Sequence, residues 1–307
     1  MDSLIRIVCL LGIACSIITI SLNINLVVKL VLNKSKRKDD MMLFYYRFVL
    51  DVLFGISLFP YIISSWLFME HPDLVENYHF LIIVFALPWS NLAACRSLVA
   101  LAISTDRLIA AYFPIAYRTG KVSIPSIIIL SVAISFGLSE ELVLFGFCAY
   151  DFVIPLNCRA FGCAVNQCFF SFWTIHKATI FFLIGVLSIL LSVRLYVWKS
   201  SKKESKTNSQ VSKANRLALL GTVTVLIFDF LPSFCSSVWP NAAMFNYDLV
   251  GPYISVGKIT GCAIEAVVVS SLLVFQKSKK SDATISSGAY FTRFWRSSMS
   301  NKHVITL

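Results

Sequence analysis

Seven long apolar segments, separated by short polar ones, run through most of the chain. Each segment reaches the length of about 20 residues that a helix needs to cross the hydrocarbon core of a bilayer. The pattern therefore predicts an all-α membrane protein, with a seven-transmembrane helix bundle in residues 1–275 and a tail in residues 276–307. The predicted helices cover residues 4–32, 43–69, 80–112, 125–149, 174–198, 217–239 and 255–275.

The first and last parts of this pattern need separate interpretation. The first segment is too long for a removed signal peptide and lacks a small-residue cleavage pattern, so we expect it to stay as a helix. The seventh segment is the weakest, because Lys258 and Glu265 interrupt it. The tail favours a short helix on an anionic membrane surface, although a disordered tail fits equally well. Its aromatic and basic residues on one helical face are Tyr290, Phe291, Arg293, Phe294, Trp295 and Arg296.

Composition agrees with a membrane protein and limits the classes of binding partner that we expect. The chain is 57% hydrophobic and only 14% charged, whereas soluble domains carry about 25% charged residues. A net charge of +11 could indicate nucleic-acid binding. However, the basic residues cluster in a few loops between apolar segments, which is typical of membrane topology. We therefore expect a lipid bilayer as partner and no nucleic acid.

The basic loops predict the orientation of the bundle. Segments 33–42, 113–124, 199–216 and 276–307 hold four, two, six and six Lys or Arg residues, 18 of the 27 in the chain. The opposite loops contain Arg159 alone. Positive loops stay in the cytoplasm, so the N-terminus is expected outside the cell and the tail inside. Four tryptophans near predicted helix ends fit an interfacial belt: Trp66, Trp173, Trp198 and Trp239.

The nine cysteines fall into two groups. Five lie inside predicted helices and are expected to be small apolar fillers. The other four, between residues 148 and 168, lie in or beside a predicted outer loop, where oxidising conditions favour at least one disulfide. Three full pairings remain open, and a zinc site is the alternative, but no His lies in that segment. We expect no metal site. The disulfide candidates are Cys148, Cys158, Cys163 and Cys168; the fillers are Cys9, Cys15, Cys95, Cys235 and Cys262.

Four ionisable residues lie near the middle of predicted helices, where charge is costly and indicates function. They are Asp51, Arg96, Asp229 and Glu265. Arg96 precedes Arg107 by eleven residues, or about 16 Å along a helix. We expect Arg96 to pair with Glu265 or Asp229 at rest and to exchange partners when a ligand binds. The alternative is a fixed polar network that only sets helix packing.

Further polar residues predict a ligand pocket among aromatic side chains, the usual composition of a small-molecule site. Lys258 and Glu265 lie two turns apart on one helix face. Glu140 and Glu141 fall in the outer half of the fourth helix, and His176 lies at the start of the fifth. With Arg96 these residues form the candidate pocket, although each alone has a structural role as the simpler explanation.

Two prolines lie inside predicted helices. Pro60 in the second helix and Pro232 in the sixth each remove a backbone hydrogen bond and permit a kink. A kinked sixth helix is the kind of two-state element that a molecular switch needs.

The third helix ends in Asp106-Arg107, followed by Pro114 and Tyr117. This stretch resembles the cytoplasmic switch of rhodopsin-like G-protein-coupled receptors. Asn25, Leu50-Asp51 and the segment 228–232 also fall at marker positions of those receptors. The resemblance implies that Arg107 contacts a heterotrimeric G protein or locks the resting state, and that Asp51 belongs to a central polar network. A helix-end arginine that only reaches the membrane interface is the alternative.

The chain departs from the rhodopsin-like pattern at several points. No Cys stands at the outer start of the third helix, and the fourth helix has no Trp. The seventh helix lacks the Asn-Pro-x-x-Tyr element, and Leu108 replaces the tyrosine that usually follows the Asp-Arg pair.

A narrower resemblance covers nearly the whole chain. Segments 43–52, 103–107 and 157–168, with Trp173 and His176-Lys177, are similar to the nematode serpentine chemoreceptors, most of all to class BC. The resemblance implies a sensory receptor for an environmental small molecule. It would lie in the plasma membrane, in a sensory cilium, and signal through a heterotrimeric G protein.

Two other classes of function were weighed. An enzyme is not expected, because the chain has no paired metal-ligating His, no Gly-x-Ser-x-Gly and no phosphate loop. We expect no cofactor. A transporter or ligand-gated channel is the stronger rival, since charges within the membrane also suit ion pathways. Association of receptor copies into an oligomer also stays open.

Overall fold

The computed structural model describes residues 2–32, 41–71, 78, 80–119, 125–154, 158, 161–201, 208–238 and 252–272. The chain divides into two units, Met1–Ala266 and Val267–Leu307, and the account below concerns the first. Several sequence predictions fall outside the described residues: most of the basic loops, the side chain of Trp198, Trp239, and the whole tail from residue 276.

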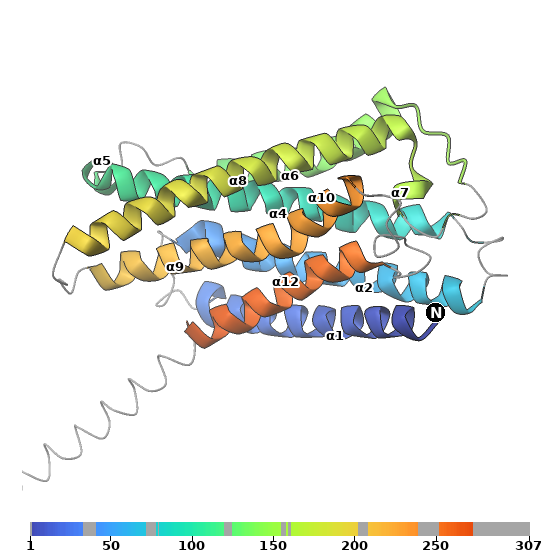
Figure 1. The fold of residues 1–307 in the computed structure, drawn as a ribbon, viewed down its shortest axis with the longest axis horizontal. Helices are drawn as coiled ribbons and strands as arrows, with labels where there is room; N and C mark the ends of the chain where they lie inside the picture. Colours follow the sequence, from blue (N-terminus) through green and yellow to red (C-terminus); the bar gives the residue numbers. More distant parts are fainter. Residues whose placement is uncertain are drawn as a thin grey trace, which may run out of the picture. The chain divides into compact units, whose positions relative to one another are not determined.

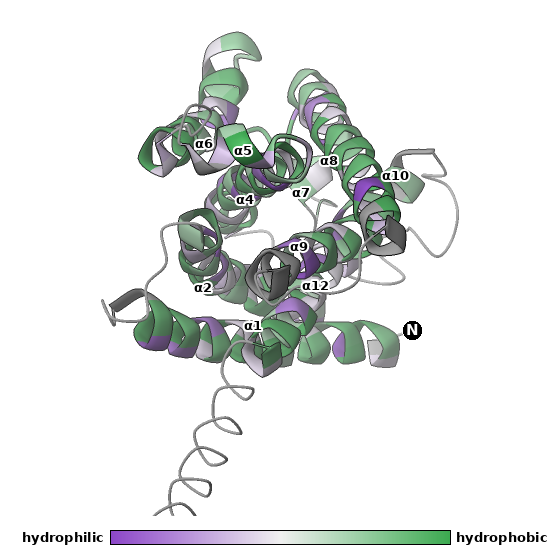
Figure 2. Ribbon diagram, turned by 90° about the vertical axis from the view of Figure 1, so that its left-hand side faces the viewer, coloured by the Kyte–Doolittle hydropathy of each residue, from purple (hydrophilic) through white to green (hydrophobic). Residues whose placement is uncertain are grey.

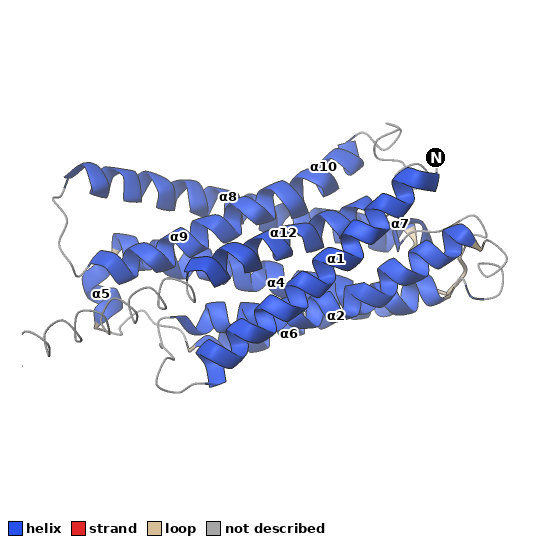
Figure 3. Ribbon diagram, turned by 90° about the horizontal axis from the view of Figure 1, so that it is seen from below, coloured by secondary structure: helices blue, strands red, loops and turns tan. Residues whose placement is uncertain are grey.

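Within the described residues, the structure is built of helices, and seven of them are long and apolar enough to cross a membrane. Figures 1 and 3 show them lying side by side along the length of the first unit. The elements are α1 (Asp2–Leu26), η1 (Val27–Leu32), α2 (Met42–Glu70), α4 (Leu81–Tyr112), α5 (Pro114–Arg118), α6 (Ser126–Glu141), η3 (Leu142–Phe147), α7 (Phe161–Ala164), α8 (Gln167–Ser201), α9 (Asn208–Thr224), η4 (Val225–Phe230), α10 (Leu231–Val238) and α12 (Tyr253–Ser270).

The fifth and sixth predicted helices begin earlier than the hydropathy pattern indicates. Helix α8 starts at Gln167 rather than at residue 174, and α9 starts at Asn208 rather than at residue 217. Both extensions contain polar residues, which a hydropathy threshold reads as loop. A helix satisfies its own backbone hydrogen bonds and can therefore continue beyond the apolar segment.

Apolar residues, green in Figure 2, make up most of each spanning helix, on outward-facing as well as inward-facing positions. In α6, for example, Ala133 and Gly137 are buried, whereas Ile127, Val132 and Leu138 are exposed. A helix that is apolar on all sides suits a lipid surround. Helix α4 is enclosed on several sides, since it packs against α2, α6, α8 and α9.

The two ends of the bundle carry different short elements. The N-terminus and α7 lie at one end, and α5 lies at the opposite end (Figure 1). We call these the α7 end and the α5 end. Each predicted functional group below belongs to one of these ends or to the polar layer between them.

Proline lies inside three of the long helices, and in one of them a π-helical turn precedes it. Pro60 lies inside α2, and Pro88, which was not singled out from the sequence, lies inside α4. Pro232 is the second residue of α10, directly after the π-helical turn η4. Proline cannot donate to the carbonyl four residues earlier, here that of Phe228. The wider η4 turn accommodates this missing bond, as π-bulges do in other helices.

Candidate functional site

At the α5 end, the structure brings together three of the residues that the sequence marks as a switch. The Arg107 guanidinium donates to the Asp106 carboxylate, with Nε 2.9 Å from Oδ2, and also to the Tyr117 hydroxyl at 3.0 Å. The Tyr117 hydroxyl lies 3.3 Å from the same carboxylate oxygen. Only 5% of the Arg107 side chain is exposed. The cation is therefore held inside its own chain rather than extended into solvent.

The local sequence explains how Tyr117 reaches this arginine. Helix α4 ends at Tyr112, and Phe113 adopts a non-helical conformation that turns the chain. Pro114 then opens α5, where its fixed φ and missing N–H are tolerated. Tyr117 lies one turn into α5 and so returns toward Asp106 and Arg107.

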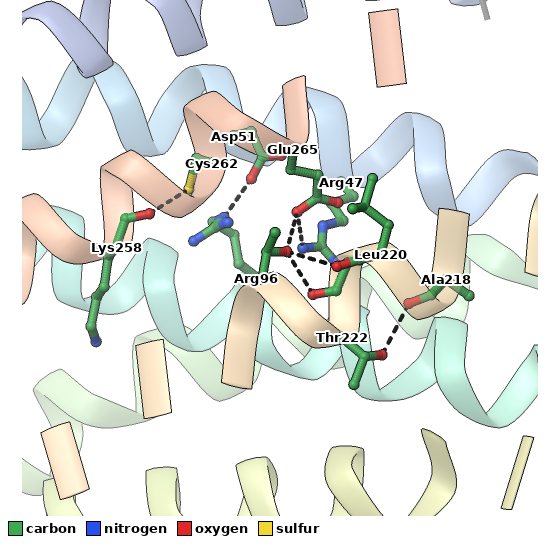
Figure 4. Close-up of polar contacts among 11 residues, drawn as sticks. Arg47, Asp51, Arg96, Ala218, Leu220, Thr222, Lys258, Cys262 and Glu265 are labelled. Atoms are coloured by element: carbon green, nitrogen blue, oxygen red, sulfur yellow. Dashed lines mark hydrogen bonds and ion pairs between the residues drawn. The ribbon is translucent and has the colours of Figure 1, made fainter. Parts of the chain in front are cut away.

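A second layer of charge lies between the two ends of the bundle, and it links α4 to α2 (Figure 4). Arg96 Nε lies 2.5 Å from Asp51 Oδ1, and the Arg96 guanidinium also lies over the Phe54 ring at 4.7 Å. From sequence, Arg96 was expected to bind Glu265 or Asp229, and that expectation is wrong. The rotation of α2 about its axis turns Asp51 toward α4, and a hydropathy pattern does not report that rotation.

Glu265 has a partner that the sequence prediction missed. Arg47 Nη2 lies 2.5 Å from Glu265 Oε2, and the exposed fractions of the two side chains are 5% and 8%. Thr224 also donates to Glu265, at 3.4 Å. The spacing of four residues between Arg47 and Asp51 puts them on one face of α2. That spacing is the sequence signal that could have revealed Arg47.

Asp229, the fourth predicted residue of this layer, is buried in η4 at 8% exposure. No basic side chain of the described residues lies within 4.0 Å of its carboxylate. It is nevertheless close enough to act electrostatically on Arg96, Lys177 and Lys258.

Nearer the α7 end, Glu140 of α6 is the centre of a separate polar cluster. The Ser90 hydroxyl donates to Glu140 at 2.7 Å. The Lys177 ammonium and His176 Nε2 lie 3.7 and 3.1 Å from Glu140 Oε1. The predicted pocket residues Glu140 and His176 therefore do meet, and Ser90 and Lys177 join them without having been predicted. No local sequence pattern links Ser90 or Lys177 to Glu140, and only the fold makes the three residues neighbours.

The remaining members of the predicted pocket are distributed over different parts of the bundle. Glu141 accepts from Asn91 at 2.7 Å, beside the Glu140 cluster. Arg96 and Glu265 belong instead to the central ion pairs. Lys258 belongs neither to the Glu140 cluster nor to the central ion pairs. Its side chain extends away from the Arg47–Glu265 pair (Figure 4). The six residues thus form no single cluster.

Two tryptophan rings lie near the Lys258 ammonium, and further aromatic rings contact them. The ammonium lies 5.8 Å from the ring centre of Trp89 and 5.7 Å from that of Trp173. Phe161 of α7 contacts both tryptophans, with ring centres 6.0 and 5.9 Å apart. Tyr61 of α2 packs against Trp89, with ring centres 5.5 Å apart and the rings tilted by 48°. We call Tyr61, Trp89, Phe161 and Trp173 the aromatic box.

Trp173, which the sequence predicts at a membrane interface, lies in α8, which begins at Gln167. Its indole N–H donates to Ser90 at 2.9 Å, and its ring lies under the Lys177 ammonium at 3.8 Å. The position of Trp173 relative to the membrane interface stays a prediction.

Comparison with known proteins now adds to this geometry. The family model of the serpentine type 7TM GPCR chemoreceptor Srbc matches residues 1–277. The chain belongs to this family. It is therefore a multi-pass membrane protein of a chemoreceptor family rather than of an enzyme family. None of the curated proteins matches the sequence.

In this Srbc receptor, the four cysteines of the segment 148–168 form two disulfides. Cys148 is joined to Cys168, and Cys158 to Cys163, which resolves the three pairings left open by the sequence. The first bond links the end of η3 to the start of α8, and the second joins Cys158 to Cys163 of α7. Together they hold α7, and with it Phe161, against the bundle.

Polar contacts in the same segment support α7. The Tyr150 hydroxyl donates to the Ala164 carbonyl at 2.6 Å, and Asn166 donates to the Cys148 carbonyl at 2.7 Å. Burial raises the pKa of Tyr150 to about 12, so its hydroxyl stays protonated and can donate at any physiological pH.

Proposed function

We propose that this chemosensory receptor binds a small environmental ligand in the half of the bundle nearer α7 and activates a heterotrimeric G protein at the α5 end. The inner ends of α4, α8 and α9 would form the G-protein surface. The observation that carries the proposal is the buried Arg107, held by Asp106 and Tyr117 at the end of α4. A cation enclosed in this way is available to a partner only after its own contacts break.

The polar layer between the ends supplies a route for coupling. Arg96–Asp51 links α4 to α2, and Arg47–Glu265 links α2 to α12. Buried ion pairs have few alternative arrangements, so a ligand that shifts one helix favours a different set of pairs instead of a gradual distortion. In this mechanism Pro232 and η4 provide the flexible point in the sixth helix, and the movement of that helix opens the α5 end.

Loss of the Arg107 contacts tests the proposal. The variant Asp106→Asn removes the charge that holds Arg107, and we expect basal nucleotide exchange on a co-expressed Gα subunit to rise about tenfold. Tyr117→Phe removes the hydrogen bonds that the hydroxyl makes with Arg107 and Asp106 but keeps the Asp106 charge, so we expect a smaller rise of about threefold. The measurement is GTPγS binding in membranes that contain receptor and G protein.

Tyr112→Phe is the matched control, because Tyr112 lies on the same helix end with 41% of its surface exposed. It should leave exchange unchanged. Equal exchange in all the variants and the wild type, over a panel of Gα classes, would contradict the G-protein proposal. A ligand-gated current in cells that lack G proteins would instead favour the channel alternative.

A further inference from the structure

Lys258 has a charge that the described part of the molecule does not neutralise directly. Its side chain is 2% exposed, and no carboxylate oxygen of the described residues lies within 4.0 Å of the ammonium. Glu140, the acid of the neighbouring cluster, accepts from Ser90 through Oε2, and its Oε1 lies 3.1 and 3.7 Å from His176 Nε2 and Lys177 Nζ rather than within reach of Lys258. A buried ammonium without an acceptor is costly, because it loses its hydration and gains no hydrogen bonds.

A second donor without a partner in the described part of the chain belongs to Trp89, whose ring centre lies 5.8 Å from the Lys258 ammonium. The indole Nε1 of Trp89 is buried and has no hydrogen-bond partner among the described residues. The other indole of the aromatic box, that of Trp173, donates to Ser90 and is satisfied. Buried polar groups in native proteins nearly always have partners, so an indole N–H and an ammonium without acceptors in the same part of the bundle indicate a missing acceptor.

These two donors define the chemistry of the acceptor. A carboxylate carries a full negative charge and two oxygens, so it can accept from both Lys258 and Trp89 and neutralise the ammonium. An amine would be repelled, and a neutral carbonyl would leave the charge uncompensated. The rings of Tyr61, Phe161 and Trp173 supply an apolar surround for the rest of the molecule.

We infer that the ligand of this receptor is a small organic acid, whose carboxylate binds Lys258 Nζ and Trp89 Nε1 and whose apolar body lies in the aromatic box. The inference rests on the proposed ligand-binding function and specifies its ligand class. Phe161 contributes to the site from α7, so the two disulfides that hold α7 also shape the box.

Direct binding to the full-length receptor in lipid nanodiscs tests the inference. The probes are benzoate, phenylacetate, hexanoate and octanoate, each compared with the amide and the amine of the same carbon skeleton. Binding is measured by saturation-transfer NMR with titration. We expect at least one acid to bind saturably and its amide and amine to bind at least about tenfold more weakly.

Variants then assign the binding to this site. Lys258→Gln should weaken acid binding by about ten- to a hundredfold, and Trp89→Phe, which keeps the ring and loses only the N–H, by about three- to tenfold. The controls are Lys29→Gln, at an exposed lysine, and Trp66→Phe, whose N–H donates to Glu70 near the end of α2. Both should leave acid binding unchanged.

Three results would overturn the inference: no acid binds, the amides or amines bind as well as the acids, or acid binding survives both Lys258→Gln and Trp89→Phe. Because Trp89→Phe is a mild change, it keeps the test valid if Lys258→Gln does not fold. The assay contains no G protein, so its failure is distinct from a failure of G-protein activation, and each result can be interpreted without the other.

Discussion

Arg47 and Arg96 each place a guanidinium inside the bundle and each bind a carboxylate at 2.5 Å. The presence of charge at this depth could be predicted from the sequence, because Asp51, Arg96 and Glu265 interrupt apolar segments. The choice of partner could not, since it depends on how each helix is rotated about its axis. Arg47 was missed because it lies near the end of a predicted helix, where an arginine usually reaches the membrane interface.

The Arg47–Glu265 pair can be tested by exchange of its charges. Arg47→Glu or Glu265→Arg alone leaves like charges buried together, and we expect each to lower the free energy of unfolding by about 3–5 kcal/mol. The double variant restores opposite charges and should recover most of that loss. The measurement is the thermal unfolding of purified receptor in detergent.

The matched control is the Arg6–Glu70 pair, in which 54% of the Arg6 side chain is exposed. Arg6→Glu should cost less than about 1 kcal/mol, as exposed ion pairs do. If the double variant is no more stable than the two single variants, the contact between Arg47 and Glu265 is not a stabilising pair.

At the scale of helices, α12 meets the sixth spanning segment through two glycines. A Cβ atom at Gly261 would lie 2.7 Å from Phe228 Cβ, and one at Gly257 would lie 3.4 Å from the Phe228 carbonyl oxygen. Glycines spaced by four residues allow membrane helices to approach closely. The contact falls on η4, where Pro232 leaves the Phe228 carbonyl without its usual partner. The existence of the two helices follows from hydropathy, but this close approach does not.

Gly261→Ala should therefore force α12 and η4 apart. We expect a loss of about 1–3 kcal/mol in the free energy of unfolding, which is typical of overpacking. The measurement is again thermal unfolding in detergent, together with the yield of monodisperse receptor.

Gly185→Ala in α8 is the control, since its Cβ would lie 3.8 Å from the nearest atom, Leu226 Cδ2. That substitution should be neutral or slightly stabilising, because alanine favours helix. Equal stability of the Gly261→Ala variant and the wild type would show that the helices tolerate the added methyl group.

For the whole molecule, the orientation in the membrane follows from the loops between the helices. The helix ends that adjoin the basic segments 33–42, 113–124 and 199–216 lie at the α5 end (Figure 1), and the two disulfides lie at the α7 end. Cytoplasmic loops are rich in basic residues, and disulfides form in oxidising compartments. Both considerations favour an α5 end in the cytoplasm and an extracellular N-terminus.

Epitope tags at the two termini test this orientation. In intact cells, antibody should label an N-terminal tag, whereas a C-terminal tag should be labelled only after the plasma membrane is permeabilised. Labelling of both tags under the same condition would mean that the chain crosses the membrane an even number of times. The reverse pattern would place Arg107 on the outer side.

The sequence by itself determined the number of spanning helices, their approximate bounds and the family of the receptor. The number and bounds of the helices depend on runs of contiguous apolar residues, because each run can be buried in lipid on its own. The family depends on short motifs such as Asp106-Arg107. Only the tertiary structure decided that Arg96 meets Asp51, that Cys148 joins Cys168 and that Lys258 lies between Trp89 and Trp173. Each of these contacts joins residues from different helices or loops, so it depends on how the helices pack and rotate rather than on any local pattern.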